Sequence, residues 1–311
     1  MIALLALILD RIFGEFNGIR HPVILMGDVI KSFEKRYYRD SIFRGILILL
    51  LLTSLAGLIG FSLYLLIQFA SFYGSSFFEI IALALINSML LAHRLLHDSV
   101  LSLIQTDQPQ IALRGLVSRD TENLSSSDCY KAGIESYAEN LSDGVVAPLF
   151  YLLLFGLPGI LIYKAINTLD SMVGYRTERY EKFGKASAKV DDWLNWIPAR
   201  TTAVFIMLLN KKWAFWQFYQ QGKLHDSPNA GHPITAMALS INGQLGGDTV
   251  YFGQLKKKAY FGKNTASKEI HQQHLRHCLQ SRNRVDITLY SLLITGILMT
   301  LPQTYFGLFY A

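Results

Sequence analysis

Residues 45–67 read GILILLLLTSLAGLIGFSLYLLI, a run of 23 residues without a charged side chain. A helix needs about 20 apolar residues to cross the hydrocarbon core of a bilayer, so this stretch predicts a membrane span. No charge follows until Glu79, and residues 80–92 are again uncharged. We therefore expect a second span near 77–92, joined to the first by a tight connection at 69–76.

The composition of the whole chain also favours a membrane protein. Of its 311 residues, 51% are hydrophobic and 17% are charged, against about 25% charged in soluble domains. This balance excludes a disordered chain, and 23 glycines without a period exclude a collagen. The two cysteines, Cys129 and Cys278, exclude a disulfide scaffold. The net charge of +6 is typical of basic cytoplasmic loops, and it also suits anionic substrates.

Two further apolar segments are less regular. Residues 144–163 carry no charge, but Gly156, Pro158 and Gly159 interrupt them. They predict either a kinked span or a re-entrant helical hairpin. Residues 287–311 are also uncharged and predict a last span near 287–310. The uncharged residues 201–210 are too few to cross a bilayer alone.

The distribution of basic residues predicts how the chain is oriented in the membrane. Basic residues are frequent at 31–44 and absent from 69–76, so the positive-inside rule places 31–44 in the cytoplasm. We favour the hairpin for 144–163 because it leaves the polar segments on both of its flanks in the cytoplasm. The expected fold is all-α: a polytopic helical membrane protein, formed as a single integral membrane domain over 1–311. Cytoplasmic helical loops are expected at 93–143, 164–200 and 211–284.

A row of carboxylates precedes the segment 144–163. Glu135, Glu139 and Asp143 are spaced i, i+4, i+8 and share one face of a helix that begins near 125–128. Carboxylates so placed repel one another unless a cation or a donor lies between them. A solvated helix face is the simplest explanation. However, the row runs directly into an apolar membrane segment, where ionisable groups are costly and usually functional.

A second polar set follows the same segment. Lys164, Asn167 and Ser171 share one helical face, and Asp170 lies beside it. Such an oxygen-rich set suits Mg²⁺, which takes one or two carboxylates together with substrate phosphates. Lys164 and Arg176 could hold phosphate oxygens. Ion pairs that anchor helix ends are the alternative.

Later features of the sequence are more ambiguous. Residues 191–200 (DDWLNWIPAR) combine two acids with two tryptophans typical of a membrane interface. Residues 227–233 (SPNAGHP) predict a loop, and no glycine-rich nucleotide motif occurs. The three lysines at 256–258 predict a solvated or lipid-facing basic turn.

In their order along the chain, these blocks resemble the CobD/CbiB family of cobalamin biosynthesis, the adenosylcobinamide-phosphate synthases. The resemblance covers nearly the whole length and rests on several long motifs: Asp10-Arg11 with Gly14, His21-Pro22-Val23, SRDT at 118–121, ESYAENLSDGVVAPLF at 135–150, KAINTLDSMVGYR at 164–176, the stretch 191–200, and SPNAG at 227–231. Glu15 stands where the family usually has aspartate, and 231–233 departs from the usual aromatic-Pro ending. AmpE-like membrane sensors are similar in outline but lack these polar blocks, so the alternative of a non-catalytic sensor or assembly protein is less favoured.

The resemblance implies a reaction and its partners. The family joins adenosylcobyric acid to (R)-1-aminopropan-2-ol or its O-phosphate through an amide bond, using ATP, with Mg²⁺ as the expected metal. The product is adenosylcobinamide or its phosphate. The expected setting is the bacterial cell membrane, with lipid around a multi-pass chain and the active site on the cytoplasmic side. Nucleic acid is not an expected partner, and other cobalamin-assembly enzymes or a second copy of the chain are left open.

The same resemblance suggests roles for the polar residues. Asp143 and Asp170 are expected to hold Mg²⁺, and Glu139 or Glu135 is the expected general base. The expected catalytic group comprises Glu135, Glu139, Asn140, Lys164 and Asn167. The expected group for substrate and phosphate binding comprises Arg119, Asp120, Arg176, Asp191, Asp192, Asn195, Arg200 and Asn229.

Overall fold

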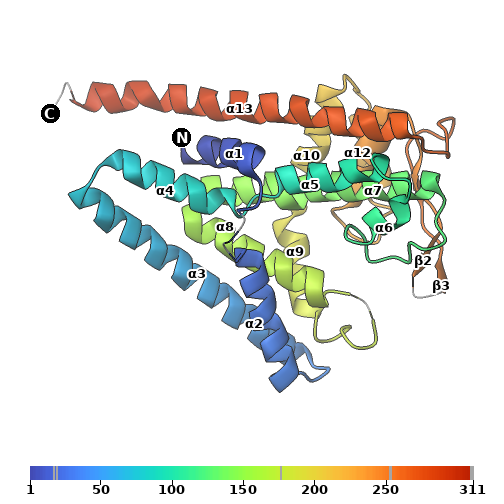
Figure 1. Cartoon of the computed structure of the whole chain (residues 1–311), viewed down its shortest axis with the longest axis horizontal. Coiled ribbons are helices and arrows are strands. Elements are labelled where there is room, and N and C mark those ends of the chain that lie inside the picture. The colour runs from blue at the N-terminus through green and yellow to red at the C-terminus, as the bar shows by residue number, and fades with distance from the viewer. Residues whose placement is uncertain (17, 19, 176, 252–253, 309–311) are drawn as a thin grey trace.

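The computed structural model consists mostly of helices (Figure 1). It describes residues 1–16, 18, 20–175, 177–251 and 254–308, and the side chains of 250, 251, 254 and 299–308 lie outside the described set. Within this part, the strands form two short antiparallel pairs, β1 with β4 and β2 with β3. The expected all-α class is therefore confirmed.

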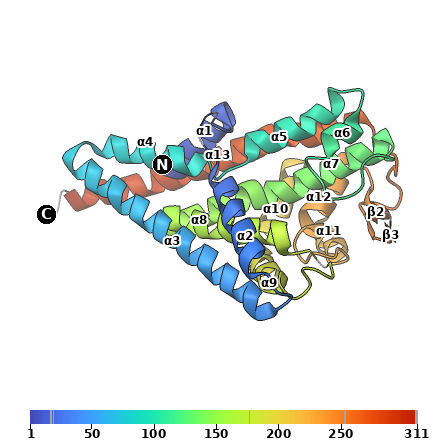
Figure 2. The same cartoon turned by 60° about the horizontal axis from the view of Figure 1, so that its bottom comes forward.

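The helices and strands follow one another in the order α1 (Ile2–Phe13), α2 (Pro22–Tyr37), α3 (Ile42–Tyr73), α4 (Ser76–Ser88), α5 (His93–Leu101), η1 (Ser102–Ile104), α6 (Pro109–Leu113), α7 (Ser126–Leu141), η2 (Ser142–Val146), α8 (Ala147–Val173), α9 (Lys185–Leu194), α10 (Trp196–Leu209), α11 (Phe215–Gly222), α12 (Gly231–Ile241), β1 (Leu245–Gly246), β2 (Thr249–Tyr251), β3 (Gln254–Lys256), β4 (Tyr260–Phe261) and α13 (Gln272–Leu308). In both views the α7–α8 segment lies between α5 and α13 on one side and α2 and α3 on the other (Figure 1, Figure 2).

Three helical stretches of the described chain are long and apolar enough to cross a membrane: Ile42–Tyr73, Ser76–Ile104 and Ser126–Val173. The first two contain the predicted spans at 45–67 and 77–92, and they meet in a sharp turn at Gly74 (Figure 1). Large apolar side chains such as Leu58 and Leu66 on α3 are exposed, as lipid contact requires. The predicted last span at 287–310 falls on α13 and stays a prediction, because the side chains from 299 onward are outside the described set.

The stretch 126–173 reverses its direction in the middle. Gly156 has φ 64° and ψ −155°, a conformation that only glycine adopts readily, and Pro158 follows it. Beyond the bend, the Tyr163 hydroxyl donates a hydrogen bond to the carbonyl of Asp143 at 3.0 Å, across 20 residues of sequence. A straight helix would separate these residues by about 30 Å. Residues 144–163 thus form a helical hairpin, and its insertion into the membrane stays a prediction.

Close helix packing holds this hairpin against α3. A Cβ atom added to Gly60 would lie only 2.8 Å from Cα of Pro158, so only glycine allows the two backbones to approach this closely. Small residues at such contacts are typical of helix pairs in membranes, where packing rather than the hydrophobic effect drives association.

A buried polar cluster fastens α13 to α1 and α5. Asp286 on α13 pairs with Arg11 at 3.3 Å and with the fully buried His93 at 3.0 Å. Arg11 also donates a hydrogen bond to Asn283 at 2.9 Å. Removing one partner of such a buried group leaves an uncompensated charge and is strongly destabilising. The cluster therefore fixes α13 across the end of α5.

Candidate active site

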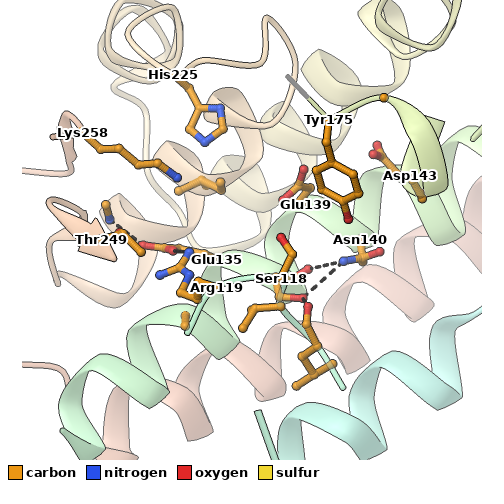
Figure 3. A pocket seen from close by; sticks show the side chains of 18 of the residues that line it. Ser118, Arg119, Glu135, Glu139, Asn140, Asp143, Tyr175, His225, Thr249 and Lys258 are labelled. Carbon is orange, nitrogen blue, oxygen red and sulfur yellow. Dashed lines mark hydrogen bonds and ion pairs between the residues drawn. The ribbon is translucent and has the colours of Figure 1, made fainter. Parts of the chain in front are cut away.

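A cavity of about 600 Å³ opens between α7, the second arm of α8, the loop at 115–119 and the strand region at 246–261 (Figure 3). This volume is in the usual range of small-molecule sites. Seven of the residues expected from the sequence line it: Arg119, Glu135, Glu139, Asn140, Asp143, Asn167 and Asp170. The reversal at Gly156 explains this meeting, because it brings the polar residues before and after the apolar segment to the same place.

Three carboxylates form an acidic wall of this cavity. Glu139 and Asp143 come from the first arm of the hairpin, and Asp170 comes from the second. Asp143 lies in the π-helical turn η2, which shifts the helical register between α7 and α8; such turns are frequent at functional sites.

This acidic wall suits a hard cation. Mg²⁺ takes one or two carboxylates from a protein and completes its shell with water and substrate phosphates. Asp143 and Asp170 offer such a pair of carboxylates on one polar cavity. Among the described residues, no group of three or more His, Cys, Asp or Glu side chains could hold a metal ion by itself. Water and substrate phosphate oxygens would complete the shell of a Mg²⁺ ion at this wall.

The two candidates for the general base have different surroundings. Glu135 uses both of its oxygens: one accepts a hydrogen bond from Arg119 at 2.7 Å, and the other accepts the N–H of Gly246 at 2.6 Å. It thereby ties α7 to the 115–119 loop and to β1. Glu139, in contrast, points into the cavity (Figure 3). The geometry therefore favours Glu139 as the residue that can accept a proton.

A hydrogen-bonded network outside the cavity connects α9 to the second arm of the hairpin. Asp191 on α9 accepts hydrogen bonds from Asn195 at 2.9 Å and from Asn167 at 3.3 Å. Asn195 in turn accepts one from the Tyr163 hydroxyl at 2.9 Å. Burial raises the pKa of Asp191 to about 6, with opposing hydrogen bonds from the two amides. Asp191 and Asn195 thus position Asn167, and neither of them is among the described residues that line the cavity.

The remaining described residues that were expected to bind substrate are not among those that line the cavity. Arg200 donates a hydrogen bond to the Asn229 side chain at 3.2 Å, and Asn229 donates one to the backbone carbonyl of Asp192 at 2.7 Å. These contacts fasten the 227–230 loop to α9 and α10. Asp120 is exposed and is not among the lining residues. Arg176 lies outside the described residues.

Lys164 lies at a position that the sequence did not predict. It is buried, with 8% of its surface exposed, and it lines a second, smaller cavity instead of the main one. The main cavity gains cationic character from Lys258, which the sequence had assigned to a solvated basic turn; for Lys258 that assignment is wrong. Its near neighbour Lys256 does lie at the surface and pairs with Asp226 at 2.6 Å.

Sequence reasoning also missed several other lining residues. Tyr175 lies over Glu139 and Asn140, and His225 faces the cavity beside Lys258 (Figure 3). Burial lowers the pKa of His225, and the charge of Lys258 lowers it further. No local signal marked His225 or Lys258, because each reaches the cavity only once α11, α12, β1 and β4 pack around α7. Ser118 could have been found, since it belongs to the SRDT block.

The fold and the site together define a helical membrane protein with a polar, acidic cavity built around a helical hairpin. A family model described as CobD/Cbib protein matches residues 3–281. The chain therefore belongs to the CobD/CbiB family of cobalamin biosynthesis proteins, as its sequence motifs indicated. No solved structure matches it.

Three relatives show how much of the chain this similarity covers. The cobalamin biosynthesis protein CobD of Halalkalibacterium halodurans is 38% identical over 273 residues, which cover 84% of this chain and 85% of the relative. A probable cobalamin biosynthesis protein CobD of Pyrococcus furiosus is 39% identical over 240 residues, covering 76% and 81%. The CobD of Geobacter metallireducens is 37% identical over 281 residues, covering 84% and 86%.

Proposed function

We propose that this protein is an ATP-dependent amide synthase. It would join the carboxylate of adenosylcobyric acid to (R)-1-aminopropan-2-ol or its O-phosphate, giving adenosylcobinamide or its phosphate. The observation that carries the proposal is the convergence of Glu139, Asp143 and Asp170 on one cavity that also contains Lys258. Acidic groups for a metal ion and a base, together with a cation for phosphate, are what carboxylate activation by ATP requires.

The proposed chemistry has two steps. A carboxylate oxygen of the corrinoid attacks the γ-phosphorus of ATP, and the bond to the β-phosphate oxygen breaks to give an acyl phosphate and ADP. The amine then attacks the acyl carbon, the C–N bond forms, and inorganic phosphate leaves while the nitrogen loses a proton. Mg²⁺ at the acidic wall would offset the negative charge of the phosphate groups.

The residues of this chain would contribute binding and proton transfer. Asp143 and Asp170 would hold the metal ion, with Asn140 and Asn167 beside them as neutral oxygen donors. Glu139 would accept the proton of the attacking amine, and a positioned base of this kind typically accelerates a reaction by about 10²–10⁴-fold. Lys258 would face the phosphoryl oxygens as a point charge.

The size of the cavity limits what can enter it. About 600 Å³ suits a nucleotide, whereas a corrinoid with its adenosyl ligand is far larger. We therefore expect only the reacting side arm of the corrinoid to reach the acidic wall. The proposed setting is the bacterial cell membrane with this cavity on the cytoplasmic side, where ATP is present and where the basic segment 31–44 is expected.

The test is product formation by the purified protein in detergent or nanodiscs. Adenosylcobyric acid, aminopropanol phosphate, ATP and Mg²⁺ are supplied, and corrinoid products are followed by mass spectrometry. The expected result is a product with the mass of adenosylcobinamide phosphate that requires both ATP and Mg²⁺. Parallel assays with free aminopropanol show which amine the protein prefers.

Matched variants make this test specific for the cavity. Asp143→Asn and Asp170→Asn are expected to abolish product formation while the protein stays folded. Asp107→Asn, a change of the same kind at an exposed position outside the cavity, is expected to leave the rate unchanged. Full activity of both cavity variants would refute the assignment of the metal site. A folded wild-type protein that forms no product would favour the sensor or assembly role.

A further inference from the structure

A second cavity, of about 220 Å³, lies between the α1–α2 connection, the chain at 89–95 and α8. The two cavities have no lining residue in common within the described part of the chain. Apolar residues form most of the wall of the second one. Its ionisable lining residues are Asp10, Glu15, His21 and Lys164.

Lys164 is the feature of this cavity that points to a ligand. Its side chain is more than nine-tenths buried, and no carboxylate oxygen of a described residue comes within 4.0 Å of its ammonium group. The charges of Asp143 and Asp191 act on it only from further away. A buried cation is costly unless an anion or hydrogen-bond acceptors complete its surroundings. It is also the one ammonium or guanidinium group among the described lining residues, so an anionic group of a ligand would meet it here.

The other side of the cavity carries the opposite charge. Asp10 is 1% exposed and accepts the backbone N–H of Arg94 at 3.3 Å, which leaves acceptor capacity on its carboxylate. Glu15 is exposed and forms no ion pair with a described residue. His21 does not neutralise them, because its Nδ1 accepts the N–H of Val23 at 3.2 Å and burial lowers its pKa. A ligand group that faces these carboxylates should be cationic.

We propose that the second cavity binds a small zwitterion with a primary ammonium group and a phosphate or carboxylate a few bonds apart. The anionic group faces Lys164, the ammonium faces Asp10 and Glu15, and the short carbon skeleton contacts the aliphatic wall. A volume of about 220 Å³ is too small for a nucleotide or a corrinoid. Aminopropanol phosphate has this chemistry. In naming it as the ligand, the inference rests on the proposed function, and it makes this cavity a site where the amine substrate docks before it moves to Glu139 in the main cavity and reacts there.

The test is direct binding by isothermal titration calorimetry, with the full chain in detergent and without ATP or corrinoid. Aminopropanol phosphate is expected to bind more tightly than free aminopropanol. Lys164→Met should weaken its binding by about ten- to hundredfold, the effect of losing one charge-assisted hydrogen bond. Lys164→Arg should retain part of the affinity, and Lys189→Met, at an exposed lysine of α9, should retain all of it.

A second variant keeps the test valid if Lys164→Met does not fold. Glu15→Gln changes an exposed side chain, so it should leave the unfolding temperature unchanged and still weaken binding several-fold. Wild-type affinity in folded Lys164→Met or Glu15→Gln protein would overturn the proposal. Tighter binding of alanine than of aminopropanol phosphate would keep the zwitterion site and overturn its link to the amine substrate.

The two proposals can fail separately. If wild-type protein forms product and Lys164→Met leaves the KM for the amine unchanged, the docking site is wrong and the amide synthase stands. If no product forms but binding depends on Lys164 as described, the zwitterion site stands and the proposed reaction is wrong. A raised KM for the amine with an unchanged KM for ATP supports both.

Discussion

Glu135→Gln is the substitution that best separates a structural carboxylate from a catalytic one at this site. The Glu135 and Arg119 side chains are 9% and 14% exposed, and their charged atoms are 2.7 Å apart. Removing one partner of a buried ion pair costs about 3–5 kcal/mol, because the other charge stays buried. Since this pair borders an open cavity, we expect the lower end, about 3 kcal/mol. With an unfolding entropy of about 2.1 cal/mol/K per residue, this corresponds to a decrease in unfolding temperature of about 5 °C for 311 residues.

The assay compares thermal unfolding and amide synthesis in the same detergent preparation. Folded Glu135→Gln protein should retain most of its kcat well below its unfolding temperature. Glu139→Gln should show the opposite pattern, with an unchanged unfolding temperature and a kcat lower by about 10²–10⁴-fold, the usual contribution of a general base.

A double-mutant cycle gives the control for this prediction. Arg119→Gln combined with Glu135→Gln should be less destabilised than the sum of the two single changes, by about 0.5–3 kcal/mol, because both charges are then removed together. The reasoning would be refuted if Glu135→Gln kept the wild-type unfolding temperature and lost its kcat. In that case Glu135, and not Glu139, would be the base.

Three further changes test other parts of the structure. Gly156→Ala places a Cβ on a residue with φ 64° and ψ −155°, so the hairpin should lose about 1–3 kcal/mol of stability, measured as a lower unfolding temperature. Gly174→Ala should reduce activity, because its Cβ would lie 1.9 Å from a carboxylate oxygen of Asp170, whereas Gly296→Ala, with nothing within 4 Å and outside the cavity, should retain activity; equal rates would contradict the close contact. Burial raises the pKa of Asp10 from 3.8 to about 6, so the unfolding free energy should decrease as the pH rises from about 4 to 7, by up to about 3 kcal/mol. Asp10→Asn should remove this pH dependence in thermal unfolding, and an unchanged pH profile would count against the burial of Asp10.

Much of the candidate site was predictable, because its residues fall in long blocks on either side of one apolar segment. The spacing of Glu139 and Asp143 gave a shared helical face, and a glycine-proline interruption gave the option of a hairpin. The sequence could not distinguish residues that line the cavity from those that support it. Asp191 and Asn195 were predicted to be site residues. They do not line the cavity, and they position Asn167 through hydrogen bonds. That distinction depends on the direction of each side chain after packing, which no local pattern contains.

The sequence by itself determined that this chain is helical, that its apolar runs are long enough to cross a membrane, and that it belongs to the CobD/CbiB family. These properties are local, because hydrophobic length and helical periodicity are read from neighbouring residues. Only the tertiary structure decided that Lys258 joins the acidic cavity while Lys164 lines a separate one. Such pairings join residues far apart in the chain, and they follow from the reversal at Gly156 and from the packing of whole elements against one another.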